Sequence, residues 1–312
     1  MSFSDKRQIL IAVDGSEHSL NATNYVAKTC HPVNLKVTLM HVMPTAPETF
    51  WDLEKADYFK AETRGRYPKW KEERREVAQT FLAKAKRSLV KAGLAESEVG
   101  VILQEREVGI ARDILAQSAH GYDAVVVARR GLSEFQESYL GSVSQKIVDG
   151  TKDVPVWVVG GDIRAKRILL AVDASENSRR AVDYVGSIVA ETKAEFTLFH
   201  VVRRFSFLDD HTLQDHEIEG FWEEVKKDIP RMFRFYKENL ERAGVDGARI
   251  STRANLDSDS RAMDILQEAT EGGYGTIVMG RRGLSKVREF LLGRVTNKVL
   301  QRAEKFAVWI VP

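Results

Sequence analysis

The chain has 312 residues, of which 43% are hydrophobic and 29% charged, with a formal net charge of +2. Its length exceeds one typical domain and predicts two domains of about 150 residues, each able to bury a core. The nearly balanced charge argues against nucleic acid or a membrane surface as a partner, and no apolar run is long enough to span a bilayer.

The single cysteine, Cys30, excludes an intramolecular disulfide. The apolar run that follows the first residues is too short for a signal peptide. Both observations lead us to expect a cytoplasmic protein.

Apolar β-branched runs alternate with segments of helical periodicity. In the first half, the expected strands are 8–13, 35–42, 99–105, 123–128 and 155–159, and the expected helices are 17–29, 70–92, 110–120 and 141–149. The second half repeats this order, with its long helix at about 221–243. Gly93 and Gly244 follow the two long helices and are expected as C-caps. Alternating strands and helices predict an α/β fold with a parallel, doubly wound sheet in each half.

An internal repeat supports this division. The segment ILIAVDGSE at 9–17 returns as ILLAVDASE at 168–176, an offset of 159. ARRGLS at 128–133 returns as GRRGLS at 280–285, and this offset is 152. The change in offset means that the first copy has about seven extra residues before this loop. We therefore predict two tandem domains, 1–160 and 161–312.

An aspartate follows the first strand of each copy, at Asp14 and Asp173. Ligands of open α/β sheets bind beyond the carboxyl ends of the strands, at the topological switch point. These aspartates are therefore candidates for contact with a nucleotide base or sugar. The alternative is that they form a local turn or cap the following helix, and the two roles are compatible.

A run rich in small residues follows the fourth strand of each copy. It has the spacing Ala128-x2-Gly131-x9-Gly141-Ser142 in the first copy and Gly280-x2-Gly283-x9-Gly293-Arg294 in the second. Small residues let the backbone approach phosphate oxygens, and a following helix N-terminus supplies amide donors. A tight loop that binds no ligand is the alternative.

With these motifs, both copies resemble the universal stress protein family over essentially the whole chain. Nucleotide-binding members carry G-x2-G-x9-G-(S/T) after the fourth strand and an aspartate after the first. The resemblance implies a flavodoxin-like sheet of order 3-2-1-4-5 in each domain and pairing of the two domains through their fifth strands, and it leaves room for a homodimer. It also implies ATP, with or without Mg²⁺, as ligand.

The nucleotide-binding positions implied by the resemblance include a valine after each second strand, which contacts adenine through its backbone. In the first copy they are Ala12, Asp14, Val42, Ala128, Gly131, Gly141, Ser142, Val143 and Ser144. In the second copy they are Ala171, Asp173, Val201, Gly280, Gly283, Gly293, Arg294, Val295 and Thr296.

Each copy departs from the family pattern at one position. Ala128 replaces the first glycine of the first copy, and Arg294 replaces the Ser or Thr of the second. The Arg294 guanidinium either pairs with phosphate or fills the site. We expect the first copy to be the better ATP site because Ser142 and Ser144 keep their hydroxyls.

The remaining candidates have simpler interpretations. The pairs Arg129-Arg130 and Arg281-Arg282 either meet phosphate or lie on the surface, solvated or in ion pairs. His41 and His200 are expected to be packed rather than to bind ligand, and Cys30 to be inert. Trp157 and Trp309 are expected to be buried between the domains. The loops at about 44–69 and 203–220 are expected to be lids or contact surfaces. His211 and His216 lack the further ligands that a metal site needs.

Three functions remain open. The first is a stress-response regulator that binds ATP or a related adenine nucleotide. The second is a scaffold or chaperone-like protein, or a carrier of another small ligand. The third is a nucleotide hydrolase, which we do not expect because no acid–histidine arrangement and no Walker motif accompany the loop.

Overall fold

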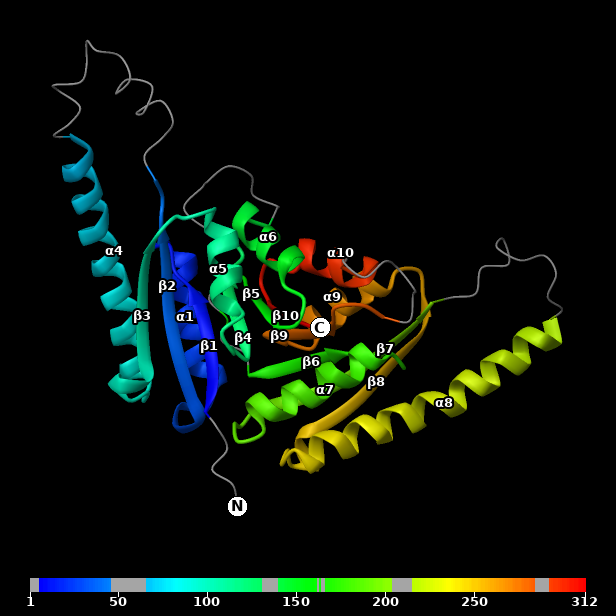
Figure 1. Cartoon of the computed structure of the whole chain (residues 1–312). Helices are drawn as coiled ribbons and strands as arrows, with labels where there is room; N and C mark the ends of the chain where they lie inside the picture. Colours follow the sequence, from blue (N-terminus) through cyan, green and yellow to red (C-terminus); the bar gives the residue numbers. More distant parts are fainter. Residues whose placement is uncertain are drawn as a thin grey trace, which may run out of the picture.

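The computed structural model describes residues 6–45, 66–130, 140–161, 163, 166–203, 215–283 and 292–312. Within these ranges the chain forms ten strands and eight α-helices, which alternate as the sequence predicts. The predicted α/β class is confirmed, and Figure 1 shows the arrangement.

The elements of the first half are β1 (Arg7–Ala12), α1 (Glu17–Thr29), β2 (Leu35–Met43), α4 (Arg66–Lys91), β3 (Val99–Glu105), α5 (Ile110–Ser118), β4 (Ala124–Ala128), α6 (Ser142–Gly150) and β5 (Val156–Val159). Those of the second half are β6 (Arg167–Ala171), α7 (Glu176–Val189), β7 (Glu195–Arg203), α8 (Asp215–Arg242), β8 (Ile250–Ser258), α9 (Arg261–Glu271), β9 (Thr276–Gly280), α10 (Arg294–Arg302) and β10 (Ala307–Val311).

All ten strands form one sheet in the order β3-β2-β1-β4-β5-β10-β9-β6-β7-β8. Each half therefore has the expected order 3-2-1-4-5, and its strands pair in parallel. The two halves meet at β5 and β10, which pair antiparallel with Trp157 opposite Trp309. This antiparallel junction relates the two halves by an approximate two-fold axis through the sheet.

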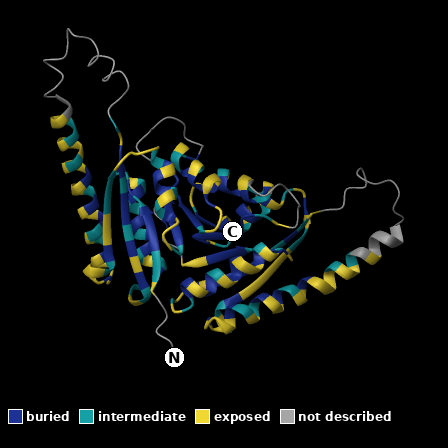
Figure 2. Cartoon of the chain, in the orientation of Figure 1, coloured by how far each residue is buried: buried dark blue, intermediate teal, exposed yellow. Residues whose placement is uncertain are grey.

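Helices cover both faces of this sheet. One core cluster lies under α1, α4, α7 and α8, and a second lies under α5, α6, α9 and α10. Every residue of β4, β5, β9 and β10 is buried, as Figure 2 shows for the centre of the molecule. Continuous runs of Val, Ile and Ala are what strands need when both faces are covered.

The two long helices begin earlier than the sequence predicts. α4 starts at Arg66 instead of residue 70, and α8 starts at Asp215 instead of residue 221. Pro68 is the third residue of α4, where its missing amide removes no helical hydrogen bond. Gly93 and Gly244 adopt φ angles of 105° and 98°, as their expected positions after helix ends require.

The loops before these two helices lie largely outside the described residues, and so does His211. Their expected role as lids or contact surfaces therefore stays a prediction. No helix of the described ranges combines the length and the apolar character that a membrane crossing requires.

Two tryptophans mark the junction of the halves. The Trp157 and Trp309 rings stack with centroids 3.9 Å apart and an interplanar angle of 3°. Both side chains are fully buried. Trp157 Nε1 donates a hydrogen bond of 3.0 Å to the Tyr184 hydroxyl, which donates to the Asp123 carbonyl at 3.1 Å. Tyr184 belongs to the second half and Asp123 to the first, so this chain of bonds crosses the junction.

Candidate functional site

The aspartates that follow β1 and β6 are held by local hydrogen bonds. Asp14 Oδ1 accepts from the Ser16 amide at 3.0 Å and from its hydroxyl at 2.6 Å. Asp173 Oδ1 accepts from the Ser175 amide at 3.1 Å and from the Ser178 hydroxyl at 2.7 Å. The turn-forming role is therefore present in both halves, and these bonds use one carboxylate oxygen of each aspartate.

A histidine of the neighbouring strand forms a hydrogen bond with the residue before each aspartate. His41 Nδ1 donates to the Val13 carbonyl at 2.7 Å, and His200 Nδ1 donates to the Val172 carbonyl at the same distance. Burial lowers the pKa of His41, against the opposing effects of the Val13 carbonyl and the Asp14 charge. The His41 ring is therefore neutral near pH 7 and positions the end of β1. Among the described residues, no group of three His, Cys, Asp or Glu side chains could hold a metal ion.

The valines expected near adenine lie just beyond the ends of the first strands. The last β1–β2 pair is Ala12 with Met40, and Val42 lies two residues further along β2. The side chains of Val42 and Val201 are only 2% and 6% exposed. A ligand at this edge could therefore meet these residues only through their backbone.

In the first half, a backbone hydrogen bond joins the two ends of the loop between β4 and α6. The Gly141 amide donates to the Arg129 carbonyl at 2.8 Å. The Ser144 hydroxyl donates to the Ala128 carbonyl at 2.7 Å. Ser144 is therefore committed to the loop framework, although it was expected to offer its hydroxyl to a ligand.

The start of α6 offers backbone donors. Gly141 is its N-cap, and no side chain caps the helix. The amides of Ser142, Val143 and Ser144 therefore have no acceptor within the helix. Ser142 is exposed, so its hydroxyl is accessible beside these amides. Gly131, the middle glycine of the motif, lies outside the described residues.

In the second half, the first glycine of the motif is required by packing. A Cβ at Gly280 would lie 2.8 Å from the Cβ of Asn177 in the first turn of α7. The Asn177 side chain also donates to the Arg282 carbonyl at 3.2 Å. α7 thus closes against this loop. Ala128 occupies the matching position of the first half, which accommodates the extra methyl group.

The second glycine of this motif lies against a carboxylate. A Cβ at Gly283 would lie 2.5 Å from Asp173 Oδ2. The second half therefore brings its aspartate and its loop together directly. The negative charge of Asp173 would repel a phosphate group bound in the same loop.

The helix start of the second half repeats the framework of the first. The Thr296 hydroxyl donates to the Gly280 carbonyl at 3.0 Å, as Ser144 does in the first half. Gly293 is the uncapped N-cap of α10, followed by the exposed Arg294 and the half-buried Val295.

The first arginine of each pair has a role that the sequence interpretation missed. Arg129 Nη1 donates to the Leu300 carbonyl at 2.6 Å, and its Nη2 donates to the next carbonyl of α10. Arg281 Nη1 donates to the Val148 carbonyl at 2.8 Å, and its Nη2 donates to the next carbonyl of α6 at 3.1 Å. Each arginine therefore caps the C-terminus of a helix in the other half. Exposed fractions of 3% and 7% show that Arg129 and Arg281 are neither solvated nor in surface ion pairs.

One further residue at this edge was not predicted from the sequence. The Tyr236 hydroxyl of α8 donates to the Asp173 carbonyl at 2.6 Å. Burial, together with the nearby Asp173 charge, raises the pKa of Tyr236 to about 12, so it remains a donor. An aromatic residue at helical spacing is typical of core packing, and no sequence signal distinguishes this one.

Comparison with known proteins assigns the family. The model of the universal stress protein family matches residues 6–160 and 164–312. Universal stress protein YxiE of Bacillus subtilis is 31% identical over 140 residues, which are 43% of this chain and 91% of that protein. Universal stress protein MJ0577 of Methanocaldococcus jannaschii is 24% identical over 148 residues, which are 45% of this chain and 91% of that protein.

Solved structures show the same fold over the whole chain. A universal stress protein from Archaeoglobus fulgidus is 21% identical and superimposes with a TM-score of 0.61 over 97% of each chain. A putative universal stress protein from Pseudomonas aeruginosa is 14% identical, with a TM-score of 0.58 over 98% of this chain and 93% of that one. The two family matches and the ten-stranded sheet lead to one conclusion: this chain belongs to the universal stress protein family and carries two of its domains in tandem.

Proposed function

We propose that this universal stress protein is a cytoplasmic stress-response regulator that binds ATP or a related adenine nucleotide at the carboxyl edge of its sheet. The observation that carries the proposal is the uncapped start of α6, where Gly141 precedes three amides without helical acceptors. Such a start favours anions through both its donors and the helix dipole. The accessible Ser142 hydroxyl adds a further donor.

We assign the nucleotide to the first half. In the second half, Arg294 replaces that serine and α7 closes on Gly280. These two features reduce the room for a phosphate chain there. Adenine would lie at the edge near Ala12 and Val42, where the buried valine side chain leaves only backbone to bind the base.

A reciprocal exchange of the two divergent residues tests this assignment. Isothermal titration calorimetry with ATP and Mg²⁺ should give about one site per chain in the native protein. Ser142→Arg should weaken binding by about tenfold or more, since a bulky side chain replaces a small donor. Arg294→Ser should leave the first site intact. It should also raise the apparent number of ATP sites per chain if the missing serine is what prevents binding in the second half.

Ser187→Arg is the matched control, because Ser187 is an exposed helical serine of α7. It adds the same charge to the protein and should leave ATP affinity unchanged. Absence of saturable binding in the native protein between micromolar and millimolar ATP would eliminate the nucleotide proposal and leave the scaffold or carrier alternative.

We also propose that the pairing of the two domains through β5 and β10 persists in solution. The antiparallel register and the stacked tryptophans support it. Because this pairing already uses both fifth strands, a homodimer of the chain would need another surface. Light scattering coupled to size-exclusion chromatography would distinguish a monomer from a dimer.

A further inference from the structure

Arg129 and Arg281 each contact both of the short helices α6 and α10. The Arg129 carbonyl accepts from the Gly141 amide at the start of α6, and the Arg281 carbonyl accepts from the Gly293 amide at the start of α10. Their guanidinium groups bond the ends of the opposite helices, Arg129 that of α10 and Arg281 that of α6. The four contacts form a closed ring, in which each helix is held at its start by the backbone of one arginine and at its end by the side chain of the other.

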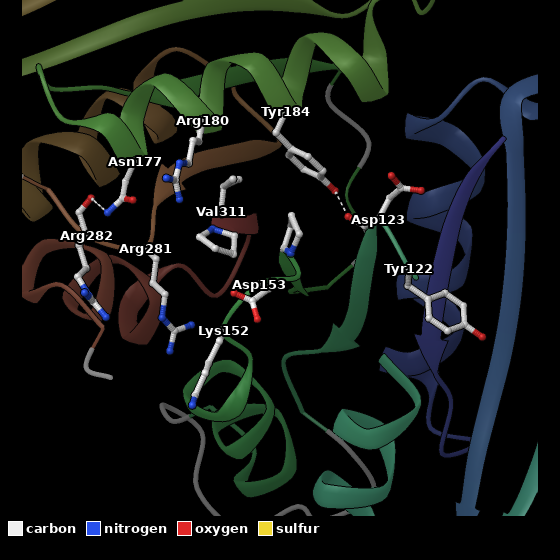
Figure 3. Close-up of a pocket in the computed structure, with 12 residues that line it drawn as sticks. Tyr122, Asp123, Lys152, Asp153, Asn177, Arg180, Tyr184, Arg281, Arg282 and Val311 are labelled. Carbon is white, nitrogen blue, oxygen red and sulfur yellow. Dashed lines mark hydrogen bonds between the residues drawn. The ribbon is translucent and has the colours of Figure 1, made fainter. Parts of the chain in front are cut away.

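The Arg281 side chain lies at the far end of α6 from the proposed phosphate site. It donates to the carbonyls of Val148 at 2.8 Å and of Asp149 at 3.1 Å. Figure 3 shows this side chain reaching toward Lys152, which follows the end of α6. The nine residues of α6 extend over about 13 Å. Arg281 is therefore too far from Ser142 to touch a phosphate there, and its influence on that site must pass through the helix.

The sequence of α6 makes it a weak helix on its own. Its nine residues, SVSQKIVDG, are fewer than an isolated helix needs, and Ser, Val, Asp and Gly are poor helix formers. No side chain caps the start of α6, and its last turn has no basic residue. Asp149 instead places a negative charge near the C-terminus, where the helix dipole disfavours it. The guanidinium of Arg281 thus supplies the cation that this helix end lacks.

The equivalent helix of the second half is less dependent on its partner. α10 has the same length as α6, but Arg302 stands in its last turn. Without the Arg129 side chain, α10 would keep a cation of its own at its C-terminus. Without the Arg281 side chain, α6 would keep only Asp149 there. The helix to which we assign the nucleotide is therefore the one that depends more on the opposite half.

An anion at the start of α6 and a cation at its end stabilise the same helix. A phosphate at this start needs the free amides of the first turn to point in one direction, which they do only while the helix is formed. A contact that favours the formed helix over a frayed one raises the populated fraction of the state that binds phosphate. The contact of Arg281 with α6 is of this kind.

The body of α6 has supports that do not involve Arg281. The side chains of Ile147 and Val148 are fully buried in the core. Gln145 of α6 accepts a hydrogen bond of 2.9 Å from Gln301 of α10. Removal of the guanidinium should therefore loosen α6 without detaching it from the sheet, so that ligand affinity can be measured on a folded protein.

We propose that Arg281 is a positioning residue for the nucleotide site of the opposite half. It holds α6 from its C-terminus and thereby sets the affinity of the α6 start for the phosphates of the nucleotide. This inference rests on the proposed function and adds a means of regulation, because the second domain acts on the ligand of the first through one side chain. By thermodynamic linkage, ATP must stabilise the contact between Arg281 and α6 as much as this contact favours ATP.

Isothermal titration calorimetry of Arg281→Gln with ATP and Mg²⁺, at a temperature where the variant is folded, tests the inference. The affinity should fall by about fivefold or more, as is typical of coupled sites. Arg281→Lys keeps the charge but loses the planar fork, so its affinity should lie between those of the native protein and Arg281→Gln. Hydrogen exchange of the α6 amides should be faster in Arg281→Gln than in the native protein, and ATP should slow it in both.

Arg249→Gln is the matched control. Arg249 also donates to carbonyls at the end of a helix, those of Ala190 at 3.0 Å and Ala194 at 3.2 Å. This helix is α7, in the same half as Arg249, and it ends at the amino edge of the sheet, away from the loops that follow β4 and β9. The variant should lose stability but keep its ATP affinity within about twofold of the native value, because distant sites act independently.

The outcomes separate this inference from the proposed function. Equal ATP affinities of the native protein and Arg281→Gln, or equal losses in Arg281→Gln and Arg249→Gln, would overturn the inference while the proposed function stood. Faster exchange in α6 with unchanged ATP affinity would also overturn it, since the order of the helix would then not govern the site. Absence of ATP binding by the native protein would remove the proposed function and the inference together.

Discussion

Arg281, in the loop after β9, donates a hydrogen bond of 2.8 Å to the carbonyl of Val148 near the end of α6. Its counterpart Arg129 makes the same contact with Leu300 of α10 at 2.6 Å. The N-terminus of each of these helices forms the candidate phosphate site of its own half. Each loop is therefore connected, through one arginine and one helix, to the loop of the other half.

Replacing either arginine should destabilise the fold. Arg129→Gln removes charged hydrogen bonds to two carbonyls in a buried setting, so we expect the free energy of unfolding to fall by about 2 kcal/mol. Arg281→Gln should have a similar effect. Urea denaturation followed by circular dichroism measures the change.

Arg231→Gln is the control for these variants. Arg231 pairs with Asp228 on α8, where its side chain is 75% exposed. Surface pairs of this kind contribute at most about 1 kcal/mol. If Arg129→Gln destabilises the protein no more than this control, the capping contact is not an important link between the halves.

The stacked tryptophans predict a second, larger effect. Trp157→Ala removes a fully buried ring from its stack with Trp309 and leaves a cavity, at an expected loss of about 3–5 kcal/mol. The near-ultraviolet circular dichroism of the pair should also decrease. Trp70→Ala, on the partly exposed face of α4, should cost much less. Equal losses in the two variants would contradict a special role for the stack.

Asp113 predicts a dependence on acid. Its buried carboxylate accepts from the amides of Glu107 at 2.9 Å, Val108 at 3.1 Å and Gly109 at 3.3 Å. Burial alone would raise the pKa of Asp113, but these amides and the Arg106 charge lower it overall.

A carboxyl group with a lowered pKa in the folded state stabilises the protein above its unfolded pKa of about 3.9, and this contribution is lost as the pH falls through the folded value. Asp113→Asn should therefore cost about 1–2 kcal/mol at neutral pH. The difference from the native protein should shrink in acid, as urea titrations at several pH values would measure. A difference that stays constant below about pH 4 would contradict this account.

Cys30 is predicted to be unreactive in the folded protein. The residue is 7% exposed, and burial raises the pKa of its thiol to about 12. The nucleophilic thiolate is therefore almost absent near neutral pH. Iodoacetamide should modify the protein only as fast as it unfolds, so labelling should accelerate with urea in step with the unfolding transition. Rapid labelling of the native protein would show that the site opens locally.

The first position of the two loop motifs allows a matched pair of substitutions. Gly280→Ala places a methyl group 2.8 Å from Asn177 Cβ and should destabilise the protein by about 1–3 kcal/mol. Ala128→Gly makes the reverse change in the first half and should cost less than about 1 kcal/mol, chiefly through chain entropy. Thermal unfolding followed by calorimetry compares the two. A neutral Gly280→Ala would mean that α7 can move away from the loop.

Much of the fold was accessible from the sequence because its determinants are local and occur twice. The buried strands appear as unbroken apolar runs, and the Gly93 and Gly244 caps follow from backbone conformation. The sequence places the starts of α4 and α8 too late, since the residues around Pro68 and the largely polar segment 215–220 lack apolar periodicity. The nucleotide-binding roles of the aspartates and loop glycines rest on short spacings in the sequence and stay predictions.

The roles of Arg129 and Arg281 could not be predicted in this way. Their partners lie 171 and 133 residues away in the sequence, and the contacts exist only once the two halves have paired. Tyr236 was overlooked because its hydroxyl contact is invisible in an otherwise ordinary amphipathic helix.

The antiparallel junction of β5 and β10 lies within one polypeptide, and this has an evolutionary consequence. In an assembly of two identical chains, any mutation beside the axis appears at both ends, so that a change useful at one end must be tolerated at the other. Covalent fusion removes this constraint. Duplicated sequences can then diverge independently, and one copy can keep an ancestral role while its twin acquires another.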